Sequence, residues 1–199
     1  MKGTIARLLI AAGIVFSLFI PFTSAHASPE ITDVFLTNTA EDLIVYASLR
    51  DGFSEGLVEA IQSGVPTTFT FHLELYRNRN VWLDEPVSSR QAKHSVKYDL
   101  LRKEYRFTRD DSGAVEERTT KSLADLKSWM SELESVPLAR YNTLIPNDRY
   151  YVRVKAEMKT TKLFFPLNYI FFFVSFLDEK TGWFESLPFT VKGLRNEHR

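Results

Sequence analysis

The stretch that decides the fold is Thr68-Phe69-Thr70-Phe71-His72-Leu73-Glu74-Leu75-Tyr76, in which apolar and polar residues alternate without a break. Successive side chains of a β-strand point to opposite faces, so this pattern predicts a strand with one face in a core and the other in solvent. The same alternation recurs at 42–50 and at 151–158. The three segments predict strands that contribute one face each to a common core.

Weaker stretches of period two extend this prediction to further strands, at 34–37, 94–99, 104–108, 138–143 and 184–191. The last of these contains Pro188, which cannot donate to a neighbouring strand, so it is predicted at a sheet edge. Between two of the runs, Asp110-Asp111-Ser112-Gly113 predicts a turn, because glycine readily adopts a positive φ.

Two short helices are predicted among the strands. Ser54 is a typical N-cap for the first, which Gly64 ends, and Ser122 begins the second, with Asp125 at the capping-box spacing. The apolar face of the second helix is predicted from four residues before Pro137: Leu123, Leu126, Met130 and Leu133. The fold class is therefore mainly β: an antiparallel β-sandwich of immunoglobulin-like architecture with two short helical insertions.

The N-terminus has the organisation of an export signal. Lys2 and Arg7 precede an uncharged apolar run at 8–22, and Ala25-His26-Ala27 supplies the small-x-small pattern that signal peptidase requires. The run is shorter than the roughly 20 residues that span a bilayer. We expect residues 1–27 to be a cleaved signal peptide and residues 28–199 a single domain without a transmembrane span.

Composition narrows the compartment and the class of protein. The chain is 44% hydrophobic and 14% aromatic, values typical of a folded domain, and it contains no cysteine. A lipid-modified N-terminal cysteine, a disulfide and a thiol nucleophile are thereby excluded. These features predict an exported protein of a Gram-negative periplasm, with full secretion as the alternative.

Charge argues against nucleic acid as a partner. Residues 28–199 carry 23 Lys and Arg against 25 Asp and Glu, a net charge of −2. The distribution is uneven, because residues 77–109 have a net charge of +5 and residues 110–135 one of −4. This asymmetry suits a charged partner or anionic headgroups, and it suits equally a set of ion pairs between neighbouring strands.

Several blocks resemble an exported bacterial family known only as domain of unknown function 4390 (DUF4390). The blocks that carry this resemblance are Leu49-Arg50-Asp51-Gly52-Phe53, the segment 59–71 with its Ser-Gly-Val-Pro core, Glu74-Leu75-Tyr76-Arg77, Lys97-Tyr98-Asp99, Glu104-Tyr105 and Trp183. The resemblance implies an envelope location and a shared fold, and it supplies no catalytic residue.

Familiar catalytic motifs are absent from the sequence. It contains no G-x-S-x-G, no H-E-x-x-H, no phosphate-binding glycine loop and no G-x-G-x-x-G. Of the four histidines, His26 lies in the expected signal peptide and His198 in a charged tail. His72 and His94 therefore remain as candidate bases or ligands. His72 shares a predicted strand face with Glu74, but two ligands make no metal site without a third. We therefore expect no metal and no cofactor.

Paired carboxylates leave a hydrolase open as an alternative. Asp51 with Asp84, or Asp99 with Glu104, would support glycoside-type chemistry only if the two members converged in one cleft. No catalytic residue is assigned, and an enzyme is less expected than a binding protein.

Two segments are candidates for binding. The turn Arg77-Asn78-Arg79-Asn80 precedes Trp82, and two guanidinium groups beside an exposed aromatic suit a carboxylate, phosphate or sugar. In residues 163–177, twelve of 15 residues are apolar and none is charged, which is typical of a central strand. The alternative is a hydrophobic loop that binds a lipid, an apolar ligand or a membrane protein. Its candidate contact residues are Phe164, Phe165, Phe171, Phe172 and Phe173.

Three functions follow in order of expectation. The first is a non-catalytic periplasmic interaction domain that docks on an envelope partner through the Phe-rich segment and the corner formed by Arg77, Arg79 and Trp82. The second is a carrier of a lipid or other apolar ligand, with the same phenylalanines lining a cavity. The third is a carboxylate-based hydrolase. A structure distinguishes the three functions. A flat exposed patch would support the interaction domain, a closed apolar cavity the carrier, and a polar cleft with paired acids the hydrolase.

Overall fold

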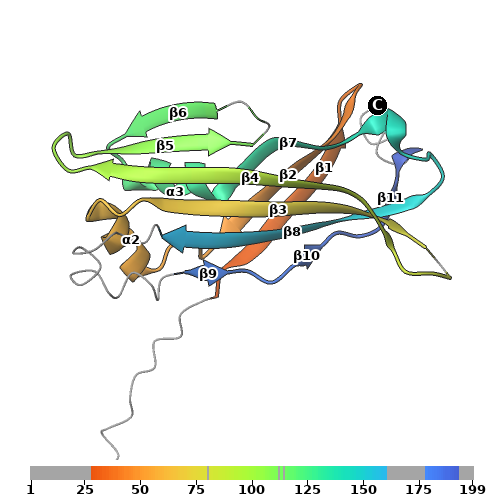
Figure 1. Ribbon diagram of the computed structural model, residues 1–199, viewed down its shortest axis with the longest axis horizontal. Helices are drawn as coiled ribbons and strands as arrows, with labels where there is room; N and C mark the ends of the chain where they lie inside the picture. The colour runs from red at the N-terminus through yellow and green to blue at the C-terminus, as the bar shows by residue number, and fades with distance from the viewer. Residues whose placement is uncertain (1–27, 80, 112, 114, 161–177, 193–199) are drawn as a thin grey trace, which may run out of the picture.

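The computed structural model describes residues 28–79, 81–111, 113, 115–160 and 178–192. These residues form two antiparallel β-sheets and two α-helices (Figure 1). The small sheet has the strand order β1-β2-β7 and the large sheet the order β10-β8-β3-β4-β5-β6, while β9 and β11 also pair with β8. The elements are β1 (Glu30–Asn38), β2 (Asp42–Arg50), α2 (Glu55–Gln62), β3 (Thr67–Asn78), β4 (Glu85–Asp99), β5 (Glu104–Asp110), β6 (Val115–Thr120), α3 (Leu123–Ser131), β7 (Glu132–Arg140), the 3-10 turn η1 (Tyr141–Thr143), β8 (Arg149–Thr160), β9 (Glu179–Lys180), β10 (Phe184–Glu185) and β11 (Phe189–Thr190).

β3, the strand with the strongest alternation, lies in the middle of the large sheet. It pairs along its length with β4 on one side and with β8 on the other. The inward side chains of β3 and β8 are fully buried: Phe69, Phe71, Leu73, Leu75, Val152, Val154, Ala156 and Met158. The three securely predicted strands, now β2, β3 and β8, are all confirmed.

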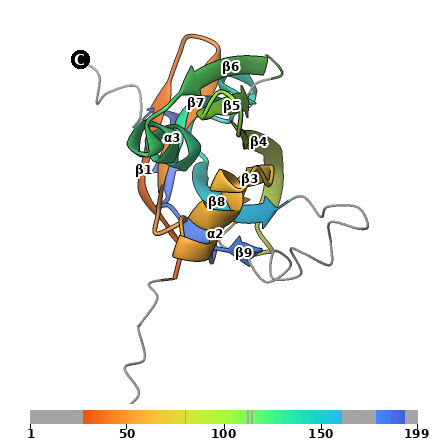
Figure 2. The same ribbon diagram turned by 90° about the vertical axis from the view of Figure 1, so that its left-hand side faces the viewer.

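The core lies between the large sheet and two coverings on the same side of it. One covering is the small sheet and the other is α3, as the end-on view shows (Figure 2). The mainly β fold with two helices in a sandwich-like arrangement is confirmed. The strands divide three and eight, a partition different from the four and three of an immunoglobulin constant domain.

The first helix begins and ends at the predicted residues. The side chain of Ser54 accepts a hydrogen bond from the N–H of Leu57 at 3.4 Å. At the other end the N–H of Gly64 donates to Ile61 and that of Val65 to Ala60, a Schellman motif that requires the positive φ of 85° at Gly64.

The second helix starts at its predicted cap, Ser122, and ends earlier than its apolar spacing predicts. α3 stops at Ser131, and Leu133 and Pro137 both belong to β7. Leu133 pairs with Ala47 of β2, so strand pairing determines the conformation here despite a spacing that fits a helix. Neither described helix has the length and apolar composition needed to cross a bilayer.

The weaker strand predictions were correct in position and often wrong in extent. The predicted strand at 138–143 is the end of β7 followed by η1, and the one at 184–191 is two short edge strands on either side of Pro188. β6 and the first half of β4 were not predicted, because their polar residues do not alternate with apolar ones.

Hydrogen bonds join the end of β8 to the residue that precedes β9. Asp178 Oδ1 accepts hydrogen bonds from the N–H of Thr160 at 2.9 Å and from its hydroxyl at 3.2 Å. Beyond this point Glu179 pairs with Met158, which adds β9 to the edge of the large sheet.

A completely buried histidine connects β4 with α3 and the β5–β6 turn. His94 Nδ1 lies 3.2 Å from the carbonyl oxygen of Met130, in the last turn of α3, and Nε2 lies 3.0 Å from Asp111 Oδ1. The imidazole thus bridges α3 and the β5–β6 turn within the core, where the rings of Phe71 and Phe107 lie 5.1 and 5.6 Å from it.

Removal of the carboxylate should leave the buried Nε2 of His94 without its hydrogen-bond partner. We expect Asp111→Ala to lower the free energy of unfolding by about 1–3 kcal/mol, the usual cost of leaving a buried polar group unsatisfied. Urea denaturation measures the change, with the partly exposed Asp110→Ala as the matched control, expected within about 0.5 kcal/mol of the parent. Equal stability of the two variants would contradict this role of the hydrogen bond.

Candidate functional site

The connection between β3 and β4 carries three exposed apolar residues in a row. Val81, Trp82 and Leu83 are 93%, 76% and 83% exposed, and we call them the hairpin tip. Figure 1 shows this hairpin extending from the end of the sandwich opposite α2. Of these three residues, the sequence pattern singles out Trp82 as a candidate, whereas Val81 and Leu83 were not predicted. The signal was available, because a run of three apolar residues is unusual where a polar turn is expected.

The hairpin is anchored by Asp84, which follows the tip. Asp84 Oδ1 accepts from the N–H of Arg79, and Oδ2 accepts from the hydroxyl of Tyr151 on β8, both at 2.9 Å. Burial, followed by this hydrogen bond, raises the pKa of Tyr151 to about 12, so the phenol keeps the proton that it donates. The ring of Tyr151 stacks on Tyr76 of β3 at 5.5 Å, which fastens the base of the hairpin to two strands.

The two predicted arginines lie at this base and contact carboxylates of the chain itself. Arg77 and Arg79 both bind Glu85 Oε2, and Arg77 also binds Asp148 at 3.3 Å. The structure thus brings Arg77, Arg79 and Trp82 into one hairpin, with the guanidinium groups already paired. An external anion would have to displace these carboxylates.

The other predicted contact residues are Phe164, Phe165, Phe171, Phe172 and Phe173, and all five lie outside the described residues. Whether residues 163–177 form a core strand or a contact surface is therefore still a prediction. The expected signal peptide at 1–27 lies outside the described residues as well.

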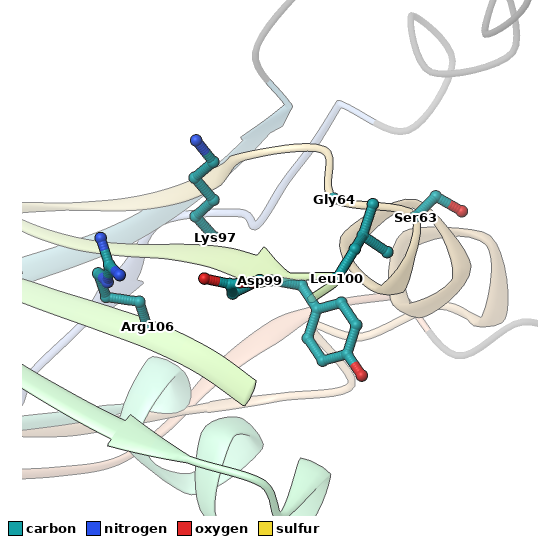
Figure 3. A pocket seen from close by; sticks show the side chains of 7 residues that line it. Ser63, Gly64, Lys97, Asp99, Leu100 and Arg106 are labelled. Atoms are coloured by element: carbon teal, nitrogen blue, oxygen red, sulfur yellow. The ribbon is translucent and has the colours of Figure 1, made fainter. Parts of the chain in front are cut away.

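A pocket of about 340 Å³ lies at the other end of β4, beside the segment that follows α2 (Figure 3). Its lining residues come from the C-terminal side of α2, from β4 with the turn after it, and from β5: Ser63, Gly64, Lys97, Tyr98, Asp99, Leu100 and Arg106. Lys97 and Arg106 are cross-strand neighbours, so two cations lie beside the carboxylate of Asp99.

Asp99 has a structural function in this pocket. Its Oδ1 accepts from the N–H groups of Leu101 and Arg102, both at 3.0 Å. The hydrogen bond from Arg102, together with that from Leu101, lowers the pKa of Asp99 below its ordinary value. The carboxyl group is therefore ionised at neutral pH and closes the β4–β5 turn, and it has no proton to donate as a general acid.

The carboxylate pairs of the hydrolase hypothesis do not share a cleft. Asp51 follows β2 next to α2, whereas Asp84 lies in the hairpin at the other end of the molecule (Figure 1). Asp99 and Glu104 face each other across β4 and β5, and Glu104 also lies 3.6 Å from Arg102. Asp99 lines the pocket beside α2 and Glu104 is not among its lining residues, so neither pair supplies two carboxylates to that pocket.

His72 and Glu74 lie on the outer face of the large sheet, as their alternation along β3 predicts. The Nε2 atom of His72 lies 3.7 Å from Glu157 on β8. Within the described ranges no three His, Cys, Asp or Glu side chains converge to hold a metal ion.

Glu157 is the centre of the ion pairs on this outer face. Lys155 and Lys159 each donate to one of its oxygens at 2.8 Å, and these bonds lower the pKa of Glu157 to about 2. A folded-state pKa below the unfolded value of about 4.3 means that the carboxylate stabilises the fold above that value. The contribution disappears as pH falls from about 4.3 to about 2.

The substitution Glu157→Gln should therefore lower stability at pH 7 by about 1 kcal/mol and leave little difference from the parent near pH 2. Denaturation midpoints measured across this pH range give the result, with the exposed Glu117→Gln as control. A difference that stayed constant down to the lowest pH would assign the effect to packing rather than charge.

Comparison with known proteins identifies a family for this chain. The sequence matches the family model described as "Domain of unknown function (DUF4390)" over residues 26–186. No curated protein and no solved structure matches the chain. Since the match covers most of the sequence and includes all the blocks that resemble this family, the chain belongs to the DUF4390 family.

Proposed function

We propose that this chain is a non-catalytic binding domain, exported to the periplasm, that docks on an apolar surface of the cell envelope through its hairpin tip. The observation that carries the proposal is the exposure of three consecutive large apolar side chains, Val81, Trp82 and Leu83. Contiguous apolar surface in water is characteristic of interaction sites.

The base of the hairpin supports this function because side-chain contacts hold it in one conformation. Asp84 joins the hairpin to Tyr151, and Glu85 holds Arg77 and Arg79 together. A tip held in one conformation loses less entropy when it binds than a free loop does. Stability alone gives no reason to expose a tryptophan at the end of such an anchored hairpin.

The described residues favour docking over the two alternatives. The pocket beside α2 is lined by Lys97, Asp99 and Arg106, unlike the closed apolar cavity that a lipid carrier requires. The candidate carboxylate pairs do not converge, which removes the best support for a hydrolase. An exposed apolar patch is the feature expected of a docking domain.

The test is sedimentation of the purified protein with membranes isolated from its own cell envelope. We expect the combined variant Val81→Ser, Trp82→Ser and Leu83→Ser to bind at least about tenfold more weakly, because each apolar side chain gains about 1.5–3 kcal/mol when fully buried. Its thermal stability should equal that of the parent, because all three side chains are solvent-exposed in the folded state.

The matched control is Leu100→Ser with Leu101→Ser, which removes two side chains that are 59% and 96% exposed at the other end of β4. This control should bind like the parent. Binding that is equal for the parent, the hairpin variant and the control would refute docking through the hairpin tip.

A further inference from the structure

We propose that the surface on which the hairpin tip docks is a lipid bilayer, with Trp82 at the boundary between headgroups and acyl chains; this inference rests on the proposed function above. Four observations favour a bilayer over a groove on another protein: the size of the tip, the chemistry of its residues, the ion-paired arginines at its base, and a second apolar side chain exposed at the same end of the sandwich.

The tip is too small for a stable protein interface. A fully buried aromatic side chain supplies about 150–250 Å². Three side chains therefore supply less than the roughly 800 Å² per partner that a specific protein interface buries. A bilayer needs no complementary surface, because it accepts any apolar protrusion with a gain that grows with the buried area.

The residues of the tip suit the membrane interface. Tryptophan combines a large apolar ring with one N–H donor, and for this reason it is enriched where acyl chains meet headgroups. Val81 and Leu83 on either side of Trp82 add apolar surface without any charge. Insertion of these three side chains buries no ionised group.

The two arginines at the base of the hairpin are paired within the protein. Arg77 and Arg79 bind Glu85, and Arg77 also binds Asp148, while the carboxylate of Asp84 accepts hydrogen bonds from the hydroxyl of Tyr151 and the N–H of Arg79. The arginines are thus engaged and offer no free guanidinium to lipid phosphates. Binding should depend on apolar burial, with little preference for anionic lipid and little sensitivity to salt.

A second loop presents an apolar side chain next to the hairpin. Ile145, in the connection from β7 to β8, is 46% exposed, and its N–H donates to the hydroxyl of Tyr150 at 2.9 Å. The same connection contains Asp148, which binds Arg77 at the base of the hairpin. Figure 1 shows both connections at one end of the sandwich. Two protrusions at one end give the domain a defined orientation on a flat surface.

The experiment measures how deeply the side chain of Trp82 enters the bilayer when the protein is added to vesicles made of lipid alone. The protein with Trp129→Phe and Trp183→Phe keeps Trp82 as its sole tryptophan. Its fluorescence is recorded with vesicles of phosphatidylcholine brominated in the acyl chains, and with a brominated mixture of phosphatidylethanolamine and phosphatidylglycerol. Because bromine quenches only an indole close to the acyl chains, binding through any other segment gives no signal.

We expect quenching of similar size in both lipid compositions and at high salt. Adding Val81→Ser and Leu83→Ser to this reporter should raise the apparent dissociation constant for vesicles at least about tenfold, while Leu100→Ser with Leu101→Ser should leave it unchanged.

The outcomes separate this inference from the proposed function. If Trp82 is not quenched, but the hairpin variant still fails to bind envelope membranes, docking stands and the partner is a protein, which overturns the lipid proposal. Quenching restricted to anionic vesicles at low salt would keep the bilayer as the docking surface and overturn apolar burial as the source of the affinity. If hairpin substitutions change binding neither to envelope membranes nor to vesicles, both proposals fail.

Discussion

Burial of the inward face of β3 is the constraint on which the rest of the structure depends. Four fully buried side chains on this strand must be covered, and the strand has a hydrogen-bonded partner on each side. β4 and β8 therefore lie next to it, and the small sheet and α3 cover the apolar face that the three strands share. The same strand ends at Asn78, so the anchored core directly determines where the hairpin tip emerges.

The sequence predicts the strands in which apolar and polar residues alternate. It fails where pairing between residues far apart in the chain determines the conformation. β2, β3 and β8 each place apolar residues on one face only, and period two identifies them. β6 and the first half of β4 contain polar residues on both faces, so only their hydrogen-bonded neighbours reveal them as strands. Leu133 has helical spacing from Met130, but its pairing with Ala47 of β2 is a contact between residues far apart in the chain.

The sequence was sufficient to predict Trp82 as part of the candidate site. It was not sufficient to predict the residues that hold the hairpin in place. Trp82 stands out in any turn, and Val81 and Leu83 carry the same signal. The partners that hold the hairpin are remote, since Arg77 and Asp148 are 71 positions apart and Asp84 and Tyr151 are 67 apart. A single sequence gives no indication of such pairs. For that reason the arginines were interpreted as free groups for a ligand, although they contact the chain's own carboxylates.

The hydrogen bonds from Thr160 to Asp178 have a consequence for how the protein tolerates change. They bring Thr160 and Asp178 into direct contact, although the two residues are 18 positions apart in the sequence. Asp178 is therefore a position that tolerates little change, because its replacement would leave the N–H at the end of β8 without this acceptor and weaken the pairing of β9 with β8.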